Sequence, residues 1–565
     1  MGGFIMTTLP LPPVETQAVG FAPILKFFFE ESGVQTIIDQ HVPLDPRRKI
    51  LTHGQASVAM VTAILCQVFQ MYRLCQFAEK SQILNIIFPN IASKEYFDDR
   101  LADTLDAIYD YGIGNLEMLI TRYMISHFDI RTTVAHNDTT SASTFGNCDK
   151  HPGEGITITY GYSKKHRQDL KQFVWSLSVS NDAAFPLYQQ AYSGNTADVS
   201  TYVQQWQHLI DLLDDRDFLY VGDCKLASID NMAHIHDNQG LFLTPAPMYS
   251  TYEKVFENAL QDHTEETLIP YKERFNRGFE TPLSIAHNDK EYPFRMIILF
   301  DHGLCFRTRQ TLNRHVEKTR KQFDDLALKL GTYHLKTQES IEKACQCILR
   351  KNKSQNFFDF EIHKEPVITF KNKRRGRASK NGDEKVAVTT NHFSVKLIFH
   401  QEHFDKALGR CGYYPLITNK NDISFEEAMQ SHKDQYKNEH TNRRAKSSLN
   451  LEPIYLQTPK RIEALLFLFK IALQMAVLIE RSAREKIKSR DKGLDNFMPN
   501  RKNVKNPTTE NLLAEFKDIV KGIIELPSGE TFGFVSKLTD IQKDILAVLG
   551  IPQHYFNYAY LFSST

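Results

Sequence analysis

The spacing of hydrophobic residues divides the chain into regions of different secondary structure. Between residues 20 and 130, apolar residues recur every three or four positions, as in helices that bury one face. Gly54 to Tyr72 is an apolar stretch with small residues suited to close packing, and Leu101 to His127 repeats the three- and four-residue spacing. We therefore predict an N-terminal helical domain over residues 1–130.

The pattern changes near Arg131, where short β-like runs begin. Three strand candidates come first, followed by an amphipathic helix and then a short apolar strand. Asn181-Asp182 supplies a hairpin turn between the second and third strands. Three consecutive strands predict a meander, and the helix-linked fourth strand predicts parallel pairing, so this region predicts an α/β fold with a mixed sheet. The elements are TTVAHND after Arg131, Phe173 to Ser180, Phe185 to Tyr192, Thr201 to Leu213 and Phe218 to Asp223.

The rest of the chain is less regular. A long helical pattern lies between Thr308 and Lys351, and a second one, interrupted by prolines, runs from Ser424 to Arg484. Residues 481–506 predict a basic linker, with nine Lys or Arg against three Asp or Glu, and Thr508 to Thr565 resembles a small appended helical region. The strand candidates between residues 240 and 425 are Met296 to Phe300, Val367 to Phe370, Val386 to Thr390, Ser394 to His400 and Tyr414 to Thr418.

Length and composition limit the possible classes of protein. A chain of 565 residues is too long for one ordinary core, so we expect two to four domains or one core with large insertions. Hydrophobic residues make up 42% and charged residues 24%, the balance of a soluble globular protein. The net charge of +1 gives no support for nucleic-acid binding, so positive charge for such a partner must be local.

Targeting and membrane signals are weak. The eight cysteines are scattered without a CxxC pair, which indicates reduced thiols in a cytoplasmic protein. The start MGGFIMTTLPLPP lacks the pattern of a signal peptide. The most apolar run, Ala464 to Ile479, is short for a bilayer span and is broken by Lys470 and Gln474, so we expect a buried core helix and no membrane domain.

Two aspartates follow or end predicted strands. Asp138 lies in HNDTT and Asp223 lies in GDCK at the end of an apolar strand. Ligand sites of α/β sheets gather outside the carboxyl ends of strands, so the two carboxylates converge if their strands are neighbours. A divalent cation relieves the repulsion between close carboxylates, and oxygen ligands favour Mg²⁺ or Mn²⁺. The alternative is that each aspartate is an ordinary turn or N-cap residue.

Several segments resemble the DDE transposases of bacterial insertion sequences. GYSKKHR (161–167) resembles the family's G-H-S-K-D-H-R segment, and SGNTAD (193–198) resembles its P-G-N-T-x-D turn. The family's third acid lies on a late helix in the pattern Tyr-x2-Arg-x3-Glu-x6-Lys. Glu439 and Lys446 keep the Glu-x6-Lys spacing, whereas His432 and Gln435 replace the Tyr and Arg. The resemblance covers roughly residues 20 to 480.

The resemblance implies an RNase H-like mixed sheet flanked by helices, with an N-terminal helical domain and a β-containing insertion domain. It implies that Asp138, Asp223 and Glu439 are catalytic and bind two Mg²⁺ or Mn²⁺ ions, with Asp138 bridging the ions. The expected domains are residues 1–130 for binding of DNA ends, 131–239 for the first part of the catalytic core, 240–423 for the insertion, 424–480 for the rest of the core, and 481–565 for the basic linker and C-terminal helical region.

Basic residues near these segments are candidate DNA contacts. Those after Glu439 and those in GYSKKHR are placed to meet phosphates, and the run from Lys371 to Lys380 is either a hairpin tip along the DNA backbone or a solvated loop. Tyr436 is either a base-stacking residue or an ordinary tyrosine. His136 either tunes Asp138 or is satisfied by a backbone hydrogen bond. The candidate DNA-binding residues are Lys446, Arg443, Arg444, Lys164, Lys165, Arg167, Lys373, Arg374, Arg375 and Arg377.

The leading hypothesis is a transposase that cleaves the terminal inverted repeats of an insertion sequence and joins them to target DNA. By this hypothesis the partner is double-stranded DNA, the protein is a homodimer on DNA, and it resides in the cytoplasm on the nucleoid. The chain has no GxSxG, Walker A or HExxH motif, so those enzyme classes lack support. Two alternatives remain open: a DNA-binding protein derived from a transposase but without catalysis, and an RNase H-like nuclease without strand transfer.

Overall fold

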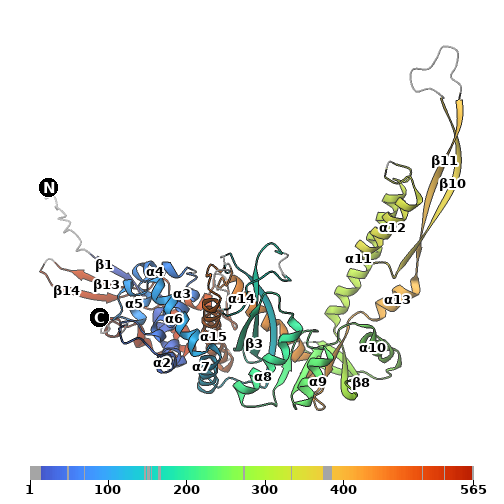
Figure 1. Cartoon of the computed structure of the whole chain (residues 1–565). Coiled ribbons are helices and arrows are strands. Elements are labelled where there is room, and N and C mark those ends of the chain that lie inside the picture. Colours follow the sequence, from blue (N-terminus) through green and yellow to red (C-terminus); the bar gives the residue numbers. More distant parts are fainter. Residues whose placement is uncertain are drawn as a thin grey trace, which may run out of the picture.

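The computed structural model is an elongated molecule (Figure 1). A helical region lies at the end that holds both termini, a large mixed sheet occupies the centre, and a long two-stranded ribbon projects from the far end. The structure describes residues 14–47, 50–68, 70–145, 148, 153, 155–162, 167–271, 274–332, 334–372, 385–452, 454–490, 492–498, 501–526 and 528–562.

The N-terminal region is helical, which confirms the prediction for residues 20 to 130. Helix α3 begins at a capping box between Thr52 and Gln55, in which each side chain binds the other residue's backbone N–H. The predicted segment Leu101 to His127 divides into two helices at Gly112, whose φ of 106° a residue with a Cβ rarely adopts. The helices are α1 (Ala22–Ser32), α2 (Val34–His41), α3 (His53–Leu65), α4 (Leu74–Ser81), α5 (Ile83–Ile87), α6 (Asp98–Tyr111) and α7 (Ile113–His127).

Helix α15 (Pro459–Arg490) joins the helical region to the sheet. It packs against α3, α6 and α7 on one side and strand β4 (Pro186–Ser193) on the other. By length and composition α15 is apolar enough to cross a membrane, but 89% of its most apolar stretch is buried inside the protein. The prediction of a buried core helix over Ala464 to Ile479 is therefore confirmed.

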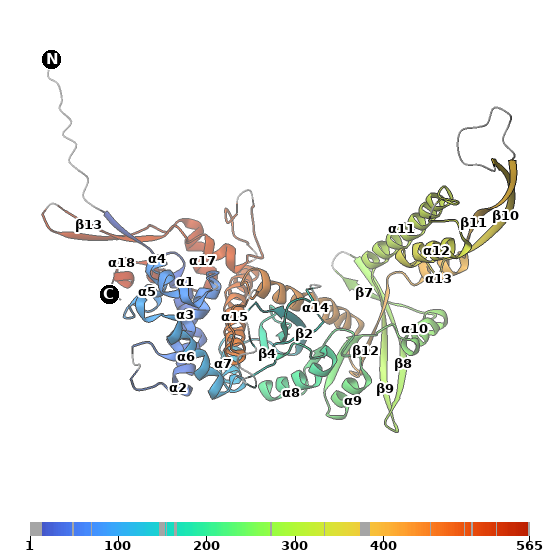
Figure 2. The same cartoon turned by 45° about the horizontal axis from the view of Figure 1, so that its top comes forward.

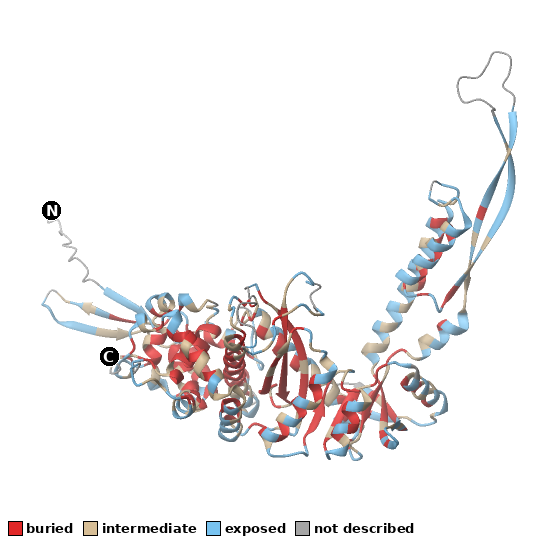
Figure 3. Ribbon diagram, in the orientation of Figure 1, coloured by how far each residue is buried: buried red, intermediate tan, exposed pale blue. Residues whose placement is uncertain are grey.

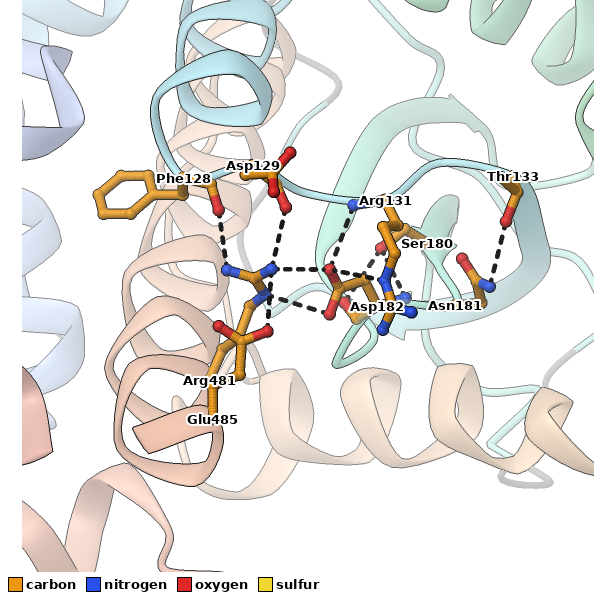
Figure 4. A network of polar contacts seen from close by, with 9 residues as sticks. All are labelled: Phe128, Asp129, Arg131, Thr133, Ser180, Asn181, Asp182, Arg481 and Glu485. Carbon is orange, nitrogen blue, oxygen red and sulfur yellow. Dashed lines mark hydrogen bonds and ion pairs between the residues drawn. The ribbon is translucent and has the colours of Figure 1, made fainter. Parts of the chain in front are cut away.

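The junction between these parts contains a buried ion pair. Arg481 of α15 forms a two-pronged ion pair with Asp182, which lies in the turn before β4, and it also donates to the carbonyl oxygens of Phe128 and Asp129 after α7 (Figure 4). The backbone N–H of Arg131 donates to the same carboxylate at 3.1 Å. One side chain thus connects three segments that are distant in the sequence.

The C-terminal region is not only helical. Helix α15 continues to Arg490, so part of the predicted basic linker is helix, and strand β13 pairs antiparallel with both β1 and β14 in a three-stranded sheet. This pairing brings the two ends of the described chain together (Figure 1). The elements are β1 (Val14–Ala18), α16 (Thr509–Ala514), β13 (Val520–Glu525), β14 (Thr531–Val535), α17 (Asp540–Leu549) and α18 (Tyr558–Phe562).

The central sheet has nine strands in the order β4-β3-β2-β5-β6-β12-β9-β8-β7. Strands β2, β3 and β4 form an antiparallel meander, and β5 pairs in parallel with β2 after the helix α8, as predicted. The structure is therefore mixed α/β, with a large mixed sheet flanked by helices. The other strands of this sheet and the helices beside it are β2 (Val134–Ser143), β3 (Gln172–Ser180), α8 (Thr201–Leu213), β5 (Leu219–Val221), α9 (Ile229–Asp237), β6 (Leu241–Pro245), α10 (Ser250–Asp262), β7 (Thr267–Tyr271), β8 (Arg274–His287), β9 (Lys290–Phe300), β12 (Tyr413–Thr418) and α14 (Phe425–Ser447).

Both faces of the middle of the sheet are covered, which explains the continuous apolar run at β5. Leu219 and Val221 belong to a hydrophobic cluster with Met429 of α14, whereas Tyr220, between them, packs into the larger core that contains Trp206 of α8. Helix α14 thus lies on one face of the sheet and α8 and α9 lie on the other (Figure 2).

The predicted insertion at residues 240–423 divides into two parts in the structure. Strands β6 to β9 and β12 extend the central sheet, whereas the segment between β9 and β12 forms a separate body with its own hydrophobic cluster. The two strand candidates on either side of Asn391 are one long strand, and the long helical pattern is two helices. The elements of this body are α11 (His302–Ala327), α12 (Gln338–Lys351), β10 (Phe358–Asn372), β11 (Lys385–Phe399) and α13 (Gln401–Gly409).

The outer half of the β10–β11 ribbon is exposed along its length (Figure 3). Four predicted DNA-binding residues between β10 and β11 lie outside the residues that the structure describes: Lys373, Arg374, Arg375 and Arg377.

Candidate functional site

Asp138 and Asp223 lie at the same level on neighbouring strands. The parallel register of β2 and β5 pairs His136 with Val221, and each aspartate follows its paired residue by two positions. Residues two apart on a strand face the same side, so Asp138 lies on the face of β2 that α14 covers, whereas Asp223 follows the last residue of β5 and is contacted from α8. Both aspartates are half-buried.

Two donors hold the Asp223 carboxylate. The hydroxyl of Tyr202, on α8, donates to Oδ1 at 2.6 Å, and the backbone N–H of Lys225 donates to the same oxygen at 2.9 Å. The ring of Tyr202 lies so close that a Cβ at Gly222 would be 2.6 Å from it, which explains the glycine before the aspartate. Burial first, and the negative charges of Asp223 and Asp138 next, raise the pKa of Tyr202, so the phenol stays a donor.

A lysine lies beside the two carboxylates. The ammonium of Lys225 forms an ion pair with Asp198, the last residue of SGNTAD. Burial alone would lower the pKa of Lys225, but the carboxylates of Asp198, Asp223 and Asp138 outweigh it and raise the pKa. The lysine therefore remains charged and partly offsets the negative charge of the site.

The segments that carry the family resemblance meet in space. Gln172, at the start of β3, donates through Nε2 to the carbonyl oxygen of Gly194 at 2.9 Å and to that of Tyr162 at 3.2 Å. A Cβ on Gly161 would clash with the Gly194 carbonyl, so this close approach requires glycine. The Gly161-Tyr162 start of GYSKKHR and the segment SGNTAD are thus neighbours, and SGNTAD leads through Asp198 to Lys225 and the carboxylates.

Helix α14 reaches the site with a polar face. Asn438 donates through Nδ2 to the backbone oxygens of His136 and Leu177, both at 3.0 Å, and so anchors the helix to two strands. One turn later, Nδ2 of Asn442 donates to Oδ2 of Asp138 at 3.0 Å. A capping box at Ser424 fixes where the helix begins.

Glu439 and Lys446 occupy different positions relative to the site. Nζ of Lys446 donates to the backbone oxygen of Ser141 on β2 at 2.6 Å. The Glu439 side chain is exposed, and it forms neither a hydrogen bond nor an ion pair with the part of the chain that the structure describes. Within the same described residues, no three His, Cys, Asp or Glu side chains are close enough to hold a metal ion. The structure therefore brings Asp138, Asp223 and Asn442 together, places Lys446 against β2 at Ser141, and leaves Glu439 facing solvent.

His136 is fully buried, and neither of its ring nitrogens has a hydrogen-bond partner among the described residues. The expectation of a backbone hydrogen bond to this histidine is wrong. Burial lowers the pKa of His136 to about 4, so the ring is neutral. His432, at the position of the family's tyrosine, also has a pKa lowered to about 4 by burial.

The predicted DNA contacts have different surroundings. Arg443 is exposed, whereas Arg444 lies between Glu480 and Glu510, 2.9 Å from a carboxylate oxygen of each. Tyr436 is 53% exposed and borders an open cavity of about 440 Å³ that Arg443 and Arg444 also line. Arg167 pairs with Asp169, and Lys164 and Lys165 fall outside the described residues.

Sequence reasoning missed Tyr202, Asn438 and Asn442. Tyr202 lies in an amphipathic helix whose pattern gives only its apolar face. The two asparagines are four positions apart on α14, which places them on one face of the helix. A search for polar residues at helical spacing on the motif-bearing helix would have found both.

Comparisons with known proteins give partial matches. Residues 14–121, the N-terminal helices, match a family described as a domain of unknown function (DUF4277). No curated protein matches the sequence significantly. A cryo-EM structure of the piggyBac transposase synaptic complex with hairpin DNA is 8% identical with a TM-score of 0.38, over 89% of this chain and 82% of that one. A Mos1 transposase paired-end complex with the left transposon end is 11% identical with a TM-score of 0.14, over 37% of this chain and 62% of that one. Both TM-scores are below 0.5, so neither likeness establishes a shared fold.

Proposed function

We propose that this protein is a DDE transposase, which cleaves DNA at the inverted-repeat ends of an insertion sequence and joins the ends to target DNA. The observation that supports this most directly is the level placement of Asp138 and Asp223 on the parallel strands β2 and β5. The meeting of the resembling segments around Gln172 supports it independently.

The donor chemistry suits a hard divalent cation. The acidic groups at the site offer only oxygen, which Mg²⁺ and Mn²⁺ prefer. Asp138 and Asp223 would hold the ions, with Glu439 from α14 as the third acid. Two such ions, if bound there, would supply activation of the attacking hydroxyl and stabilisation of the leaving 3′-oxygen. Tyr202 and the Lys225 backbone keep the Asp223 carboxylate in place, and the Lys225 ammonium limits the repulsion between the acids.

Local basic residues would bind the DNA. Lys446 of α14 contacts the strand that carries Asp138, Arg443 of the same helix is exposed, and the exposed ring of Tyr436 is available for base stacking. By this proposal the protein acts as a homodimer on double-stranded DNA, in the cytoplasm on the nucleoid.

The exposed side chain of Glu439 favours one competing function, a DNA-binding protein without catalysis. The direct test incubates the purified protein with Mg²⁺, target DNA and DNA that carries the sequences flanking its gene. The transposase proposal expects cleaved ends joined to target. Binding without any cleavage would establish the non-catalytic alternative, and cleavage without joining would establish a nuclease.

Glu439→Gln should abolish Mg²⁺-dependent cleavage and leave DNA binding nearly unchanged, because only the negative charge of a ligand is removed. Glu426→Gln is the matched control, since Glu426 is also an exposed glutamate of α14 but lies more than three turns away. Gel assays of cleavage and of binding would be run on both variants. Full cleavage by the Glu439→Gln protein would remove Glu439 from the catalytic set.

Lys446→Ala should weaken binding near the cleaved end and make it less dependent on salt. Each phosphate contact contributes a slope of about 0.9 in the plot of log K against log salt concentration, so loss of one contact lowers the slope by about that amount. Titrations from low to high salt measure the slope for both proteins. An unchanged slope would mean that Lys446 makes no contact with a phosphate and serves the protein structure, for example through the backbone oxygen of Ser141.

A further inference from the structure

Asn442 is the side chain of α14 that the structure places against the Asp138 carboxylate. It is 5% exposed, and Nδ2 donates to Oδ2 of Asp138 at 3.0 Å and to Oδ1 of Asn438 at 3.4 Å. Its own amide oxygen, Oδ1, is buried and accepts no hydrogen bond from the described residues. The Nδ2 group of Asn442 therefore donates hydrogen bonds, whereas Oδ1 of the same amide, which contacts Asp138 through Nδ2, accepts none from the described residues.

An unsatisfied buried acceptor is costly. Leaving such a group without a partner costs about 1–3 kcal/mol, so one that persists in a site points to a partner that binds there. A buried carbonyl oxygen beside carboxylates is a typical ligand for a hard cation, because Asn oxygens and carboxylates share the coordination of Mg²⁺ and Ca²⁺ in proteins.

Resting on the proposed function, we propose that Asn442 supplies a neutral oxygen ligand, through Oδ1, to the divalent cation held by Asp138. The motif spacing identifies Glu439 as the acid of α14, but Asn442, three residues further along the helix, is the one in contact with β2. The cation site would then take a neutral oxygen from Asn442, in addition to the charged oxygen that the proposed function assigns to Glu439.

A purely positioning role for Asn442 differs from a ligand role in one spectroscopic signature. Asn442→Asp keeps an oxygen at the position of Oδ1 but replaces the donor with a second negative oxygen facing Asp138. Either role allows this variant to bind the cation tightly, because the cation relieves the repulsion between the two carboxylates. Only direct ligation through Oδ1 gives a strong electron–nuclear coupling between bound Mn²⁺ and a carbon-13 label in the asparagine side chains of the wild type, and Asn442→Asp should abolish that coupling. A wild-type protein that binds Mn²⁺ without this coupling would overturn the assignment of Asn442.

The experiment measures Mn²⁺ binding to the full chain without DNA, by calorimetry and by the electron paramagnetic resonance signal of free Mn²⁺. Asn442→Ala should raise the Kd by about tenfold or more, because even outer-shell partners of metal ligands contribute 10- to 100-fold. Asn442→Asp should bind Mn²⁺ at least as tightly as the wild type. Asn421→Asp, an exposed position in the turn before α14, is the control for added charge and should leave the Kd unchanged.

Melting temperatures in EDTA and in Mn²⁺ provide a second test, which still applies if a variant folds poorly. Asn442→Asp should melt lower than the wild type in EDTA, because two carboxylates face each other, and should gain more from Mn²⁺ than the wild type gains. An unchanged Kd for Asn442→Ala, a weaker Kd for Asn442→Asp, or no larger Mn²⁺ gain would overturn the assignment of Asn442. A wild-type protein that binds Mn²⁺ through Asn442 but never cleaves DNA would overturn the transposase proposal and leave this assignment standing.

Discussion

The Asp223→Asn protein is expected to bind DNA as the wild type does but to cleave it at least about a thousandfold more slowly, since metal ions supply several kcal/mol of transition-state stabilisation and each 1.4 kcal/mol changes the rate tenfold. The substitution keeps the local structure because an amide oxygen still accepts from the Tyr202 hydroxyl and the Lys225 backbone N–H. Only the negative charge is removed.

Asp138→Asn should have an effect of the same size, because its amide oxygen can still accept from Asn442. Asp230→Asn provides the control, as Asp230 is a largely exposed aspartate shortly after Asp223. Cleavage rates under single turnover and DNA affinity are measured for all three variants and the wild type. Cleavage near the wild-type rate by either site variant would remove that aspartate from the catalytic set.

Local sequence patterns were sufficient to predict the first half of the sheet. The strands β2 to β5 are consecutive or separated by one helix, and their hydrophobic spacing is clear, so the meander and a parallel pairing could be predicted. The convergence of Asp138 and Asp223 was predicted only for the case that their strands are neighbours. The prediction that Asp138 ends its strand is wrong, because β2 continues to Ser143. The remaining strands could not be placed. Strand β12 pairs with β6 and β9 across the intervening ribbon body, and no local pattern encodes such a distant pairing.

The orientation of α14 could not be predicted from the sequence for a different reason. Its buried face contains polar residues such as Asp434, Asn438 and Asn442, so no apolar stripe indicates which side faces the sheet. The motif spacing fixed Glu439 and Lys446 relative to each other but not relative to β2. Only the structure distinguishes Asn442, which contacts Asp138, from Glu439, which faces solvent.

Arg481→Ala is expected to destabilise the protein by about 3–5 kcal/mol, the usual result of removing one partner from a buried ion pair. The Arg481 and Asp182 side chains are 11% and 5% exposed. Loss of the guanidinium leaves the buried carboxylate without its bidentate partner, although the Arg131 backbone N–H still donates to it, and leaves two carbonyl oxygens without this donor (Figure 4). Because the pair connects α7, the β3–β4 turn and α15, hydrogen exchange should increase at all three. Glu485→Ala is the matched control: Glu485 is 54% exposed and pairs with the same arginine, so its removal should cost no more than about 0.5 kcal/mol.

The ion pair between Arg481 and Asp182 makes the destabilisation caused by Arg481→Ala depend on pH. Burial alone would raise the pKa of Asp182, but the hydrogen bonds from Arg481 and from the Arg131 backbone hold that pKa below its ordinary value. A carboxyl group whose pKa is lowered by folding stabilises the fold above its unfolded pKa, about 3.9 for aspartate, and this stabilisation is lost as the pH falls through the folded pKa. Urea unfolding should therefore show the full difference between wild type and Arg481→Ala at pH 7 and a smaller one below about pH 3.9. A difference that stays constant across this range would mean that Arg481 acts through its carbonyl contacts and packing rather than through the charge of Asp182.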